Sequence, residues 1–307
     1  MKTALLFSGQ GSQYVGMLKD VSEKYPEVQK MAEIADNKAG FKISQILYNG
    51  PADMLKETRF TQPALCLHSS AIFSLVKDKI EYSGVAGHSV GEYAALFAAG
   101  VLSFEDAMQL VSLRGKLMFS TGQRYPGTMF AVIGLEDEKV EEVCKKLSDN
   151  EDGNVVVPAN HNCPGQLVVS GSAEFLRENA NEFKEAGARM VKELQVSGAF
   201  HSPLMQPAKD ELENAIADTQ FSDAKVPVYV NISGKPLTKA DELRQALIDQ
   251  LTSPVKWTQT IKQMKDDSFE KYIEIGPGNV LQGLVKRTIE GVEIEGLDKA
   301  EDIEKYK

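Results

Sequence analysis

Cysteine is scarce in this chain: Cys66, Cys144 and Cys163 stand among 307 residues, with no C-x-x-C pair. Such an odd, scattered set favours a reducing compartment over a disulfide framework. Long apolar runs are also missing. The first run ends at Ser8, too short for a signal-peptide core, and the longest, residues 94–102, is well below the ~18 residues of a membrane span. We therefore expect a soluble, cytoplasmic protein without a membrane partner.

Positive charge is in deficit as well. The chain has 34 Lys and Arg residues against 44 Asp and Glu residues, which gives a net charge of -10. Nonspecific nucleic-acid binding needs a basic footprint, so we expect no nucleic-acid partner. An acidic protein partner stays compatible, because a local basic patch can coexist with a negative total.

Motifs for nucleotides and metals are absent too. Gly9-Gln10-Gly11-Ser12 begins like a dinucleotide-binding loop, but Tyr14 stands where the third glycine is required. The chain has no G-x-x-x-x-G-K-[ST], no H-E-x-x-H and no paired-cysteine spacing. We therefore expect neither a nucleotide cofactor nor a bound metal.

What is present is an alternation of short apolar runs with longer helical patterns, which predicts an α/β fold. Residues 127–196 follow a different order, β-α-β-β-α-β, which is the ferredoxin-like arrangement. We interpret this segment as an insertion into a larger α/β domain made of residues 1–126 and 197–307.

Individual elements follow from the same patterns. Residues 3–7 and 85–86 read as buried strands, a helix is predicted to open at Thr61, and residues 173–186 read as one helix. Other predicted elements are a helix with an N-cap at Ser103, a helix from Pro203, strands at 154–159, 166–170, 189–196, 227–231 and 272–275, and a final helix after Gly276-Pro277-Gly278-Asn279.

Gly87-His88-Ser89-Val90-Gly91 matches the G-x-S-x-G nucleophile elbow between a predicted strand and a predicted helix. The sharp turn strains the serine backbone, and only glycines two positions to either side leave room for it. The hydroxyl then stands above the sheet, and the N–H of Val90 points to where an oxyanion would form. A chance Gly/Ser turn is the alternative, but the strand before and the helix after favour a nucleophile.

A nucleophilic serine needs a base, and the chain has four histidines. His88 points away from Ser89 on an elbow, and His68 lies on an apolar helix face. His161 falls in a predicted polar loop. His201 follows a predicted strand and precedes a helix, the usual position for chemistry in an open α/β sheet, so spacing favours it.

Arg114 lies in the middle of the apolar face of the helix that begins after Ser103. A buried guanidinium is costly unless it is paired, and none of its neighbours on that helix face is acidic. Its partner is either a carboxylate from elsewhere in the fold or a substrate carboxylate, unless the side chain extends to solvent.

Together these motifs resemble the malonyl-CoA:acyl-carrier-protein transacylases of bacterial fatty-acid synthesis. The resemblance runs nearly end to end, and seven motifs in the right order make it specific. The motifs are Phe7-Ser8-Gly9-Gln10-Gly11-Ser12-Gln13, Thr61-Gln62-Pro63-Ala64, Gly87-His88-Ser89-Val90-Gly91-Glu92, Arg114-Gly115-Lys116, Gly198-Ala199-Phe200-His201-Ser202, Pro254-Val255-x-Trp257 and Glu274-Ile275-Gly276-Pro277-Gly278.

The resemblance implies a hydrolase-like large domain with a parallel sheet, carrying a ferredoxin-like insertion. It implies Ser89 as nucleophile and His201 as base, with the imidazole oriented by the main-chain carbonyl of Gln250. It also implies an oxyanion hole made by the N–H groups of Gln10 and Val90.

For the substrate, the resemblance implies that Arg114 binds the malonyl carboxylate and that Phe200 crowds a methyl branch on the malonyl carbon. The implied reaction is ping-pong transfer from malonyl-CoA to the phosphopantetheine thiol of acyl carrier protein. CoA and phosphopantetheine enter as parts of the substrates, so no resident cofactor is implied.

Three alternatives stay open. A serine thioesterase would use the same elbow, although Arg114 on an apolar face argues against it. A malonyl acyltransferase serving a polyketide synthase would share every motif. A catalytically silent module that only binds carrier protein is disfavoured by the intact set of Ser89, His201, Gln10 and Arg114.

Acyl carrier proteins are strongly acidic, so docking on this negative chain needs a local basic patch. Lys286 and Arg287 lie on the helix that follows Gly276-Pro277-Gly278, a turn on the same sheet edge as Ser89. Lys116 is a further candidate. The alternative for Lys286 and Arg287 is that they only complement a helix C-terminus.

Overall fold

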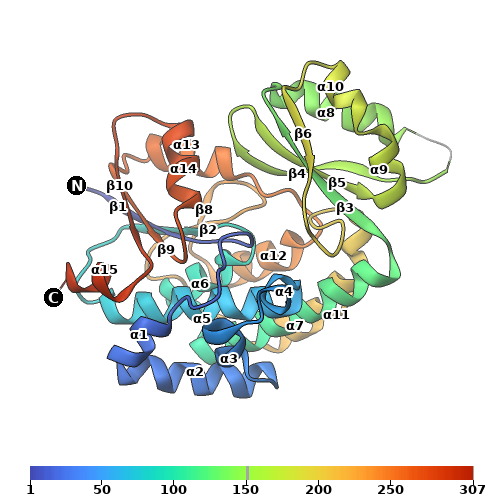
Figure 1. Cartoon of the computed structure of the whole chain (residues 1–307). Helices are drawn as coiled ribbons and strands as arrows, with labels where there is room; N and C mark the ends of the chain where they lie inside the picture. Colours follow the sequence, from blue (N-terminus) through green and yellow to red (C-terminus); the bar gives the residue numbers. More distant parts are fainter. Residues whose placement is uncertain (150–151, 307) are drawn as a thin grey trace.

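Two β-sheets of unequal size organise the chain in the computed structural model, which describes residues 1–149 and 152–306 (Figure 1). The larger has six strands in the order β10-β9-β1-β2-β7-β8, all parallel except β8, which runs antiparallel to β7. The smaller has four antiparallel strands in the order β4-β5-β3-β6. The predicted α/β class is confirmed.

The strands of the described residues are β1 (Thr3–Phe7), β2 (Gly84–Gly87), β3 (Gly127–Ile133), β4 (Val156–Cys163), β5 (Gln166–Ser172), β6 (Met190–Glu193), β7 (Val228–Tyr229), β8 (Pro236–Leu237), β9 (Lys271–Ile275) and β10 (Glu293–Leu297). The α-helices are α1 (Lys19–Lys24), α2 (Pro26–Ala39), α3 (Ile43–Asn49), α4 (Ala52–Lys56), α5 (Thr58–Val76), α6 (Gly91–Ala98), α7 (Phe104–Arg124), α8 (Asp137–Ser148), α9 (Ala173–Asn179), α10 (Asn181–Glu185), α11 (Gln206–Asp218), α12 (Ala240–Gln250), α13 (Trp257–Asp266), α14 (Val280–Thr288) and α15 (Ala300–Glu304), with a 3-10 turn at Pro203–Met205.

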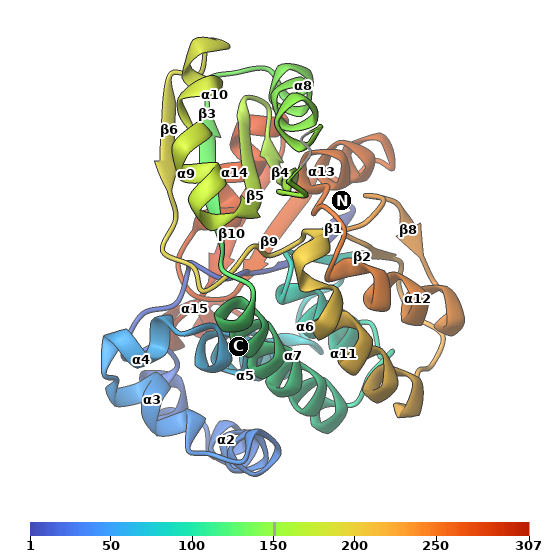
Figure 2. The same cartoon turned by 90° about the vertical axis from the view of Figure 1, so that its right-hand side faces the viewer.

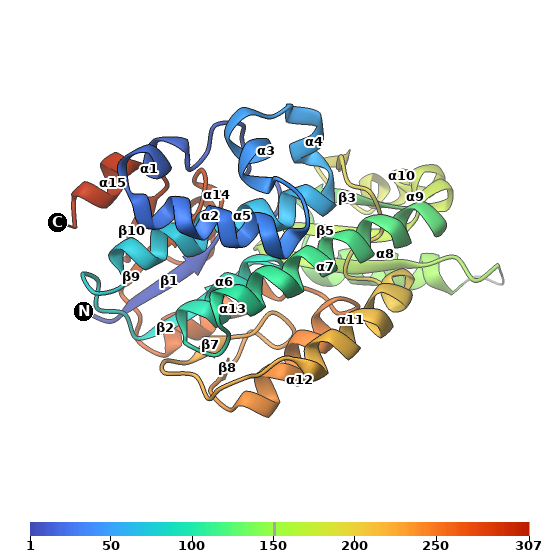
Figure 3. The ribbon, with the colours of Figure 1, turned by 90° about the horizontal axis from the view of Figure 1, so that it is seen from below.

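The large sheet is covered on both faces because side chains alternate along its central strand. Leu5 and Phe7 of β1 join the core formed with α5, α6 and α7, whereas Ala4 and Leu6 join the core formed with α13 and α14. Figure 3, seen from below, shows α2, α5 and α7 lying across the first of these faces. No helix in the described part of the chain is long and apolar enough to cross a membrane.

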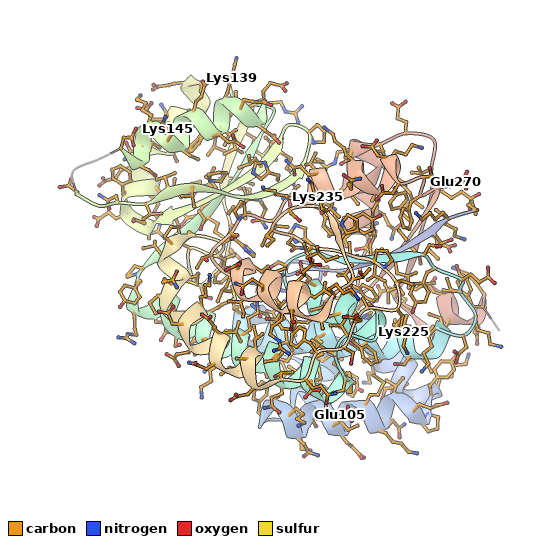
Figure 4. All side chains as sticks on the ribbon, turned by 180° about the vertical axis from the view of Figure 1, so that it is seen from behind. Glu105, Lys139, Lys145, Lys225, Lys235 and Glu270 are labelled. Carbon is orange, nitrogen blue, oxygen red and sulfur yellow. The ribbon has the colours of Figure 1, made fainter. Side chains whose placement is uncertain are left out.

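The small sheet carries its own core. Val140, Cys144 and Leu147 of α8 pack with buried residues of β3, β4 and β5, while Lys139 and Lys145 of the same helix point outward (Figure 4). Figure 2 shows this sheet standing above the helices of the larger unit. Its strand β4 is fixed to the large unit because the N–H of His161 donates to the carbonyl of Val255 at 2.9 Å.

Several predicted boundaries change. Helix α5 begins at Thr58 rather than Thr61, because the carbonyl of Glu57 already accepts the N–H groups of Phe60 and Thr61. The single helix predicted for residues 173–186 is two helices, and the Asn179 side chain donates to the carbonyl of Phe175 at their junction.

The helix after Gly276 is not the last element, since β10 and α15 follow it. The sequence of β10, EIEGL, has exposed or half-buried positions at all but its last residue, so it lacks an apolar signal. His161 belongs to β4 rather than to a loop, because two register shifts carry that strand on to Cys163. Strands β6 and β7 are shorter than predicted.

The carboxyl ends of three parallel strands meet at one edge of the large sheet. Phe7 of β1 lies in register with Gly87 of β2 on one side and with Ile275 of β9 on the other. The loops after these strands therefore converge, and this is the edge at which ligands bind in open α/β sheets.

Candidate active site

Ser89 occupies the turn between β2 and α6 with a left-handed φ of 52°, so the predicted strain is present. A Cβ on Gly87 would lie 2.0 Å from the carbonyl oxygen of Gly91, and a Cβ on Gly91 would lie 2.2 Å from that of Phe7. Both glycines of the motif are therefore required by close backbone approach, as predicted from the sequence.

His201 meets this serine across the site. Its Nε2 lies 2.8 Å from Ser89 Oγ, and its Nδ1 lies 3.1 Å from the main-chain carbonyls of both Gln250 and Ser253. Because carbonyl oxygens only accept, Nδ1 carries the proton and Nε2 is free to accept one from the serine. Two carbonyls thus stand where a Ser-His-Asp triad has a carboxylate.

Arg114 is buried, with 1% of its surface exposed, and it contacts oxygen atoms of uncharged side chains. Its Nη1 donates to Gln62 Oε1 at 2.8 Å, and its Nη2 donates to Gln250 Oε1 at 2.9 Å and to Ser89 Oγ at 3.1 Å. No carboxylate of the described residues forms an ion pair with it. A full guanidinium charge therefore faces the candidate nucleophile without an ionic partner.

These groups line a cavity of about 150 Å³ between the two sheets. Gln10 and Val90 both border it, and their backbone N–H groups have no hydrogen-bond partner among the described residues. Two free donors beside a serine hydroxyl are what an oxyanion hole requires. The cavity wall is otherwise largely apolar, formed by Met118, Met129, Val168, Leu194, Val196 and Phe200.

Burial dominates the electrostatics of the site. It lowers the pKa of His201 to about 3, helped by the nearby positive charge of Arg114. It also lowers the pKa of Arg114 and raises the pKa of the Glu92 carboxyl to about 7. His201 is consequently a neutral acceptor at physiological pH.

Among the described hydrogen bonds, none joins the other three histidines to Ser89 Oγ, although His88 borders the cavity. His68 is paired through Nε2 with Asp298 at 3.0 Å, while its buried Nδ1 has no hydrogen-bond partner among the described residues. His88 contacts Asn162 at 2.9 Å. His161 lies near the carboxylates of Asp137 and Glu141, at 3.5 and 3.8 Å. In the described ranges, no group of three His, Cys, Asp or Glu side chains is arranged to hold a metal ion.

The three predicted docking residues line different surfaces. Lys116 borders a groove with Lys38 and Arg59. Lys286 borders a hollow with Ile294 near the start of β10, and Arg287 donates to Gln166 Oε1 at 2.6 Å. Helix α14 connects two parallel strands, β9 and β10, so it begins near the sheet edge of Ser89 and runs back toward the opposite edge. Both basic residues are in its last turn.

Sequence reasoning missed two residues that hold the elbow. Asn231 and Glu92 are buried beneath Ser89 and are joined to each other by a 2.9 Å hydrogen bond. The available signal for Asn231 was its place at the end of a predicted strand. Gln62 belongs to the motif Thr61-Gln62-Pro63-Ala64, but its position in the sequence does not indicate that its side chain contacts Arg114.

A serine hydroxyl hydrogen-bonded to a neutral imidazole, beside two free N–H donors, is the arrangement of enzymes that form an acyl-serine ester. The chain belongs to the acyl transferase domain family, whose model matches residues 4–307.

Two curated relatives are malonyl CoA-acyl carrier protein transacylases. The one from Haemophilus influenzae is 42% identical over 94% of this chain and 92% of its own, and the one from Staphylococcus aureus is 39% identical over 98% and 97%. A solved complex of a type II polyketide acyl-carrier protein with its malonyl-transacylase is similar over 100% of this chain and 99% of that chain, at 36% identity and a TM-score of 0.94.

We expect the His201 imidazole to stay neutral from about pH 8 down to about pH 4, because its pKa lies near 3. Nitrogen-15 NMR of histidine-labelled protein would follow the ring, with a His201→Asn variant to identify its signals and circular dichroism to verify folding at each pH. The activity of the free enzyme should then show no acidic limb near pH 6.5. A ring titration midpoint near that ordinary value would contradict the assignment.

Proposed function

We propose that this acyltransferase moves a malonyl group from malonyl-CoA to the phosphopantetheine thiol of acyl carrier protein, feeding fatty-acid elongation. The observation that carries the proposal is the buried Arg114 guanidinium, which lies 3.1 Å from Ser89 Oγ and lacks a carboxylate partner. A malonyl carboxylate supplies that partner in a bidentate pair. The names of the relatives in Haemophilus influenzae and Staphylococcus aureus support the same substrates.

The first half-reaction begins when Ser89 Oγ attacks the thioester carbonyl carbon and His201 Nε2 takes the hydroxyl proton. The carbonyl oxygen becomes an oxyanion, which the N–H groups of Gln10 and Val90 stabilise. When the intermediate collapses, the C–S bond breaks and the CoA sulfur leaves with the proton from His201. A malonyl-serine ester remains.

The second half-reaction reverses these roles. The phosphopantetheine thiol gives its proton to His201 and attacks the ester carbonyl, after which the Ser89 oxygen leaves and recovers the proton. The carbonyls of Gln250 and Ser253 hold the imidazole in the required tautomer throughout. The Phe200 ring beside the cavity disfavours a branched malonyl carbon.

Arg114 also links substrate charge to base strength. In the free enzyme its positive charge helps to lower the pKa of His201. A malonyl carboxylate placed against the guanidinium offsets that charge and raises the pKa of His201 toward its ordinary value. An anionic acyl group thus strengthens the base that activates Ser89, which an acetyl group does not do.

We also propose a hydrolase-like catalytic domain of residues 1–126 and 197–307 and an inserted ferredoxin-like domain of residues 127–196. The element order β3-α8-β4-β5-α9-α10-β6, with two short helices in place of the second helix, and the spatial strand order β4-β5-β3-β6 support the second of these. Residues 150–151 and 307 fall in the proposed ranges but lie outside the described residues. Neither a resident cofactor nor a metal is needed, and the three free cysteines support a cytoplasmic location.

Transfer to a polyketide-synthase carrier protein is the second candidate function. It is favoured by the similarity to the type II polyketide complex at a TM-score of 0.94. Parallel assays with a fatty-acid carrier protein and a polyketide carrier protein would separate the two pathways. A thioesterase would instead release free malonate, which the same assays detect.

The direct test of the proposal is intact-protein mass after brief exposure to malonyl-CoA. We expect wild-type protein to gain one malonyl group and to pass it to carrier protein. Ser89→Ala should gain none while keeping its fold, since alanine fits the elbow sterically. A malonyl adduct on the Ser89→Ala protein would contradict the assigned nucleophile, and an absent adduct on wild-type protein would contradict the function.

We expect Arg114→Ala to change selectivity rather than only lower activity. The lost bidentate pair is worth about 1.5–3 kcal/mol, so malonyl transfer should fall at least about tenfold. Acetyl transfer, which does not use the guanidinium, should hold or rise. Arg124→Ala on the exposed end of the same helix is the matched control. Equal losses for both acyl groups would make Arg114 a structural residue.

Carrier-protein docking is proposed for Lys286 and Arg287, with Lys116 as a separate candidate. Reversing Lys286 and Arg287 to Glu should weaken transfer to carrier protein and flatten its salt dependence, with little effect on loading from malonyl-CoA. Lys139 and Lys145, both exposed on α8, provide a control reversal with the same change in net charge. If both pairs act alike, the effect comes from total charge and not from docking.

A further inference from the structure

The strained backbone of Ser89 is held from both sides. Glycines at positions 87 and 91 make the turn sterically possible, but absence of a clash does not hold a residue at a φ of 52°. A conformation of this kind persists only where surrounding groups determine it. The hydrogen bonds made by the Ser89 peptide groups identify those surroundings.

The Asn231 side chain bonds to two peptide groups on the amino-terminal side of the strained residue. Its Oδ1 accepts the N–H of Ser89 at 2.7 Å, and its Nδ2 donates to the carbonyl of Gly87 at 2.7 Å. The side chain is fully buried, and its own backbone N–H donates to Glu92 Oε2 at 2.9 Å. Asn231 follows β7, the strand that pairs with β2. The segment after the neighbouring strand therefore supplies the side chain that bonds to the elbow.

We propose that Asn231 is a positioning residue for the nucleophile, a role that rests on the proposed function of Ser89. Its amide fixes the Ser89 backbone so that the hydroxyl meets His201 and the Val90 N–H faces the cavity. The chemistry requires an amide, because one bond needs an acceptor and the other needs a donor at a fixed separation. A carboxylate offers two acceptors, and one of these would face the lone pairs of the Gly87 carbonyl.

A substitution at Asn231 tests the elbow with fewer other effects on the site than a substitution at Gln250. The Gln250 side chain also donates to the Ser89 carbonyl at 3.0 Å, but it contacts Arg114 too, and its carbonyl orients His201. Asn231 does not line the cavity and has no hydrogen bond to either of those residues. Its replacement therefore acts on the reaction through the backbone of the elbow and removes no hydrogen bond of Arg114 or His201.

The first experiment measures single-turnover acylation of Asn231→Ala by malonyl-CoA, over a range of substrate concentrations. We expect the maximal acylation rate constant to fall about tenfold to a hundredfold, since small misplacement of a reacting group has effects of this size. The concentration giving half-maximal rate should change little, because Arg114 and the cavity wall are intact. A wild-type rate constant would overturn the proposal.

The second experiment uses Asn231→Asp, which keeps the side-chain shape and so guards against a failure of the alanine variant to fold. When protonated, the new carboxyl has both an acceptor and an O–H donor and can make both bonds. When ionised, it loses the bond to the Gly87 carbonyl. Burial raises the pKa of such a carboxyl. The acylation rate of Asn231→Asp relative to wild type should therefore rise as the pH falls from about 8 to about 5.5.

Four titratable or charged groups lie around Asn231 and Ser89. Glu92 on α6 accepts the N–H of Asn231, His88 precedes Ser89 on the elbow, and Arg114 and His201 contact Ser89 Oγ. Wild type and Asn231→Ala carry these four groups without the new carboxyl, so their pH profiles show the titration of these groups, including Glu92 with its pKa of about 7. Asn179→Asp, which removes an amide bond to the carbonyl of Phe175 in the small unit, is the matched control and should load at the wild-type rate.

The outcomes are distinguishable. If wild-type protein does not acquire malonyl mass, the proposed function fails. If wild-type protein is acylated but Asn231→Asp is slower than wild type by the same factor at every pH, the elbow does not require a paired donor and acceptor. The positioning role then fails. The positioning role is supported if the rate of Asn231→Asp relative to wild type rises at low pH. It is also supported if that relative rate stays near one while Asn231→Ala is slow.

Discussion

The close approach of the β2–α6 turn to the end of β1 is the constraint from which the rest of the site follows. His88 donates its N–H to the carbonyl of Phe7 at 3.0 Å, and Gly91 leaves no space for a side chain against the same residue. With the turn pressed against β1 in this way, Ser89 takes a left-handed conformation and stands above the sheet. The same approach brings the N–H groups of Gln10 and Val90 to one cavity.

The electrostatics of the site depend on the Arg114 guanidinium, which forms no ion pair with a carboxylate of the described residues. Nη1 and Nη2 of Arg114 donate to the side-chain oxygens of Gln62, Gln250 and Ser89, which do not cancel its charge. Its buried Nε has no hydrogen-bond partner among the described residues. This charge helps to keep His201 neutral, and under the proposed function it also pairs with an anionic acyl group. If the proposed function holds, one buried side chain connects the protonation state of the base with the choice of substrate.

The cavity depends on both sheets being held together. Backbone hydrogen bonds join β4 to Val255, and Asn162 of that strand contacts His88 on the elbow. Met129 and Val168 of the small sheet complete the apolar wall. The smaller unit therefore forms part of the cavity beside Ser89.

The sequence by itself determined the α/β class, the nucleophile elbow and the need for both of its glycines, because each depends on local patterns along a few residues. The place of Arg114 on a buried helix face followed from helical periodicity in the same way. Only the tertiary structure decided which histidine meets Ser89, since His201 lies 112 positions away and four histidines competed. It also decided that Arg114 lacks a carboxylate and that Asn231 holds the elbow. These contacts join segments whose separation in the chain carries no periodic signal, and they exist only once the strands have paired and the loops at their carboxyl ends have converged.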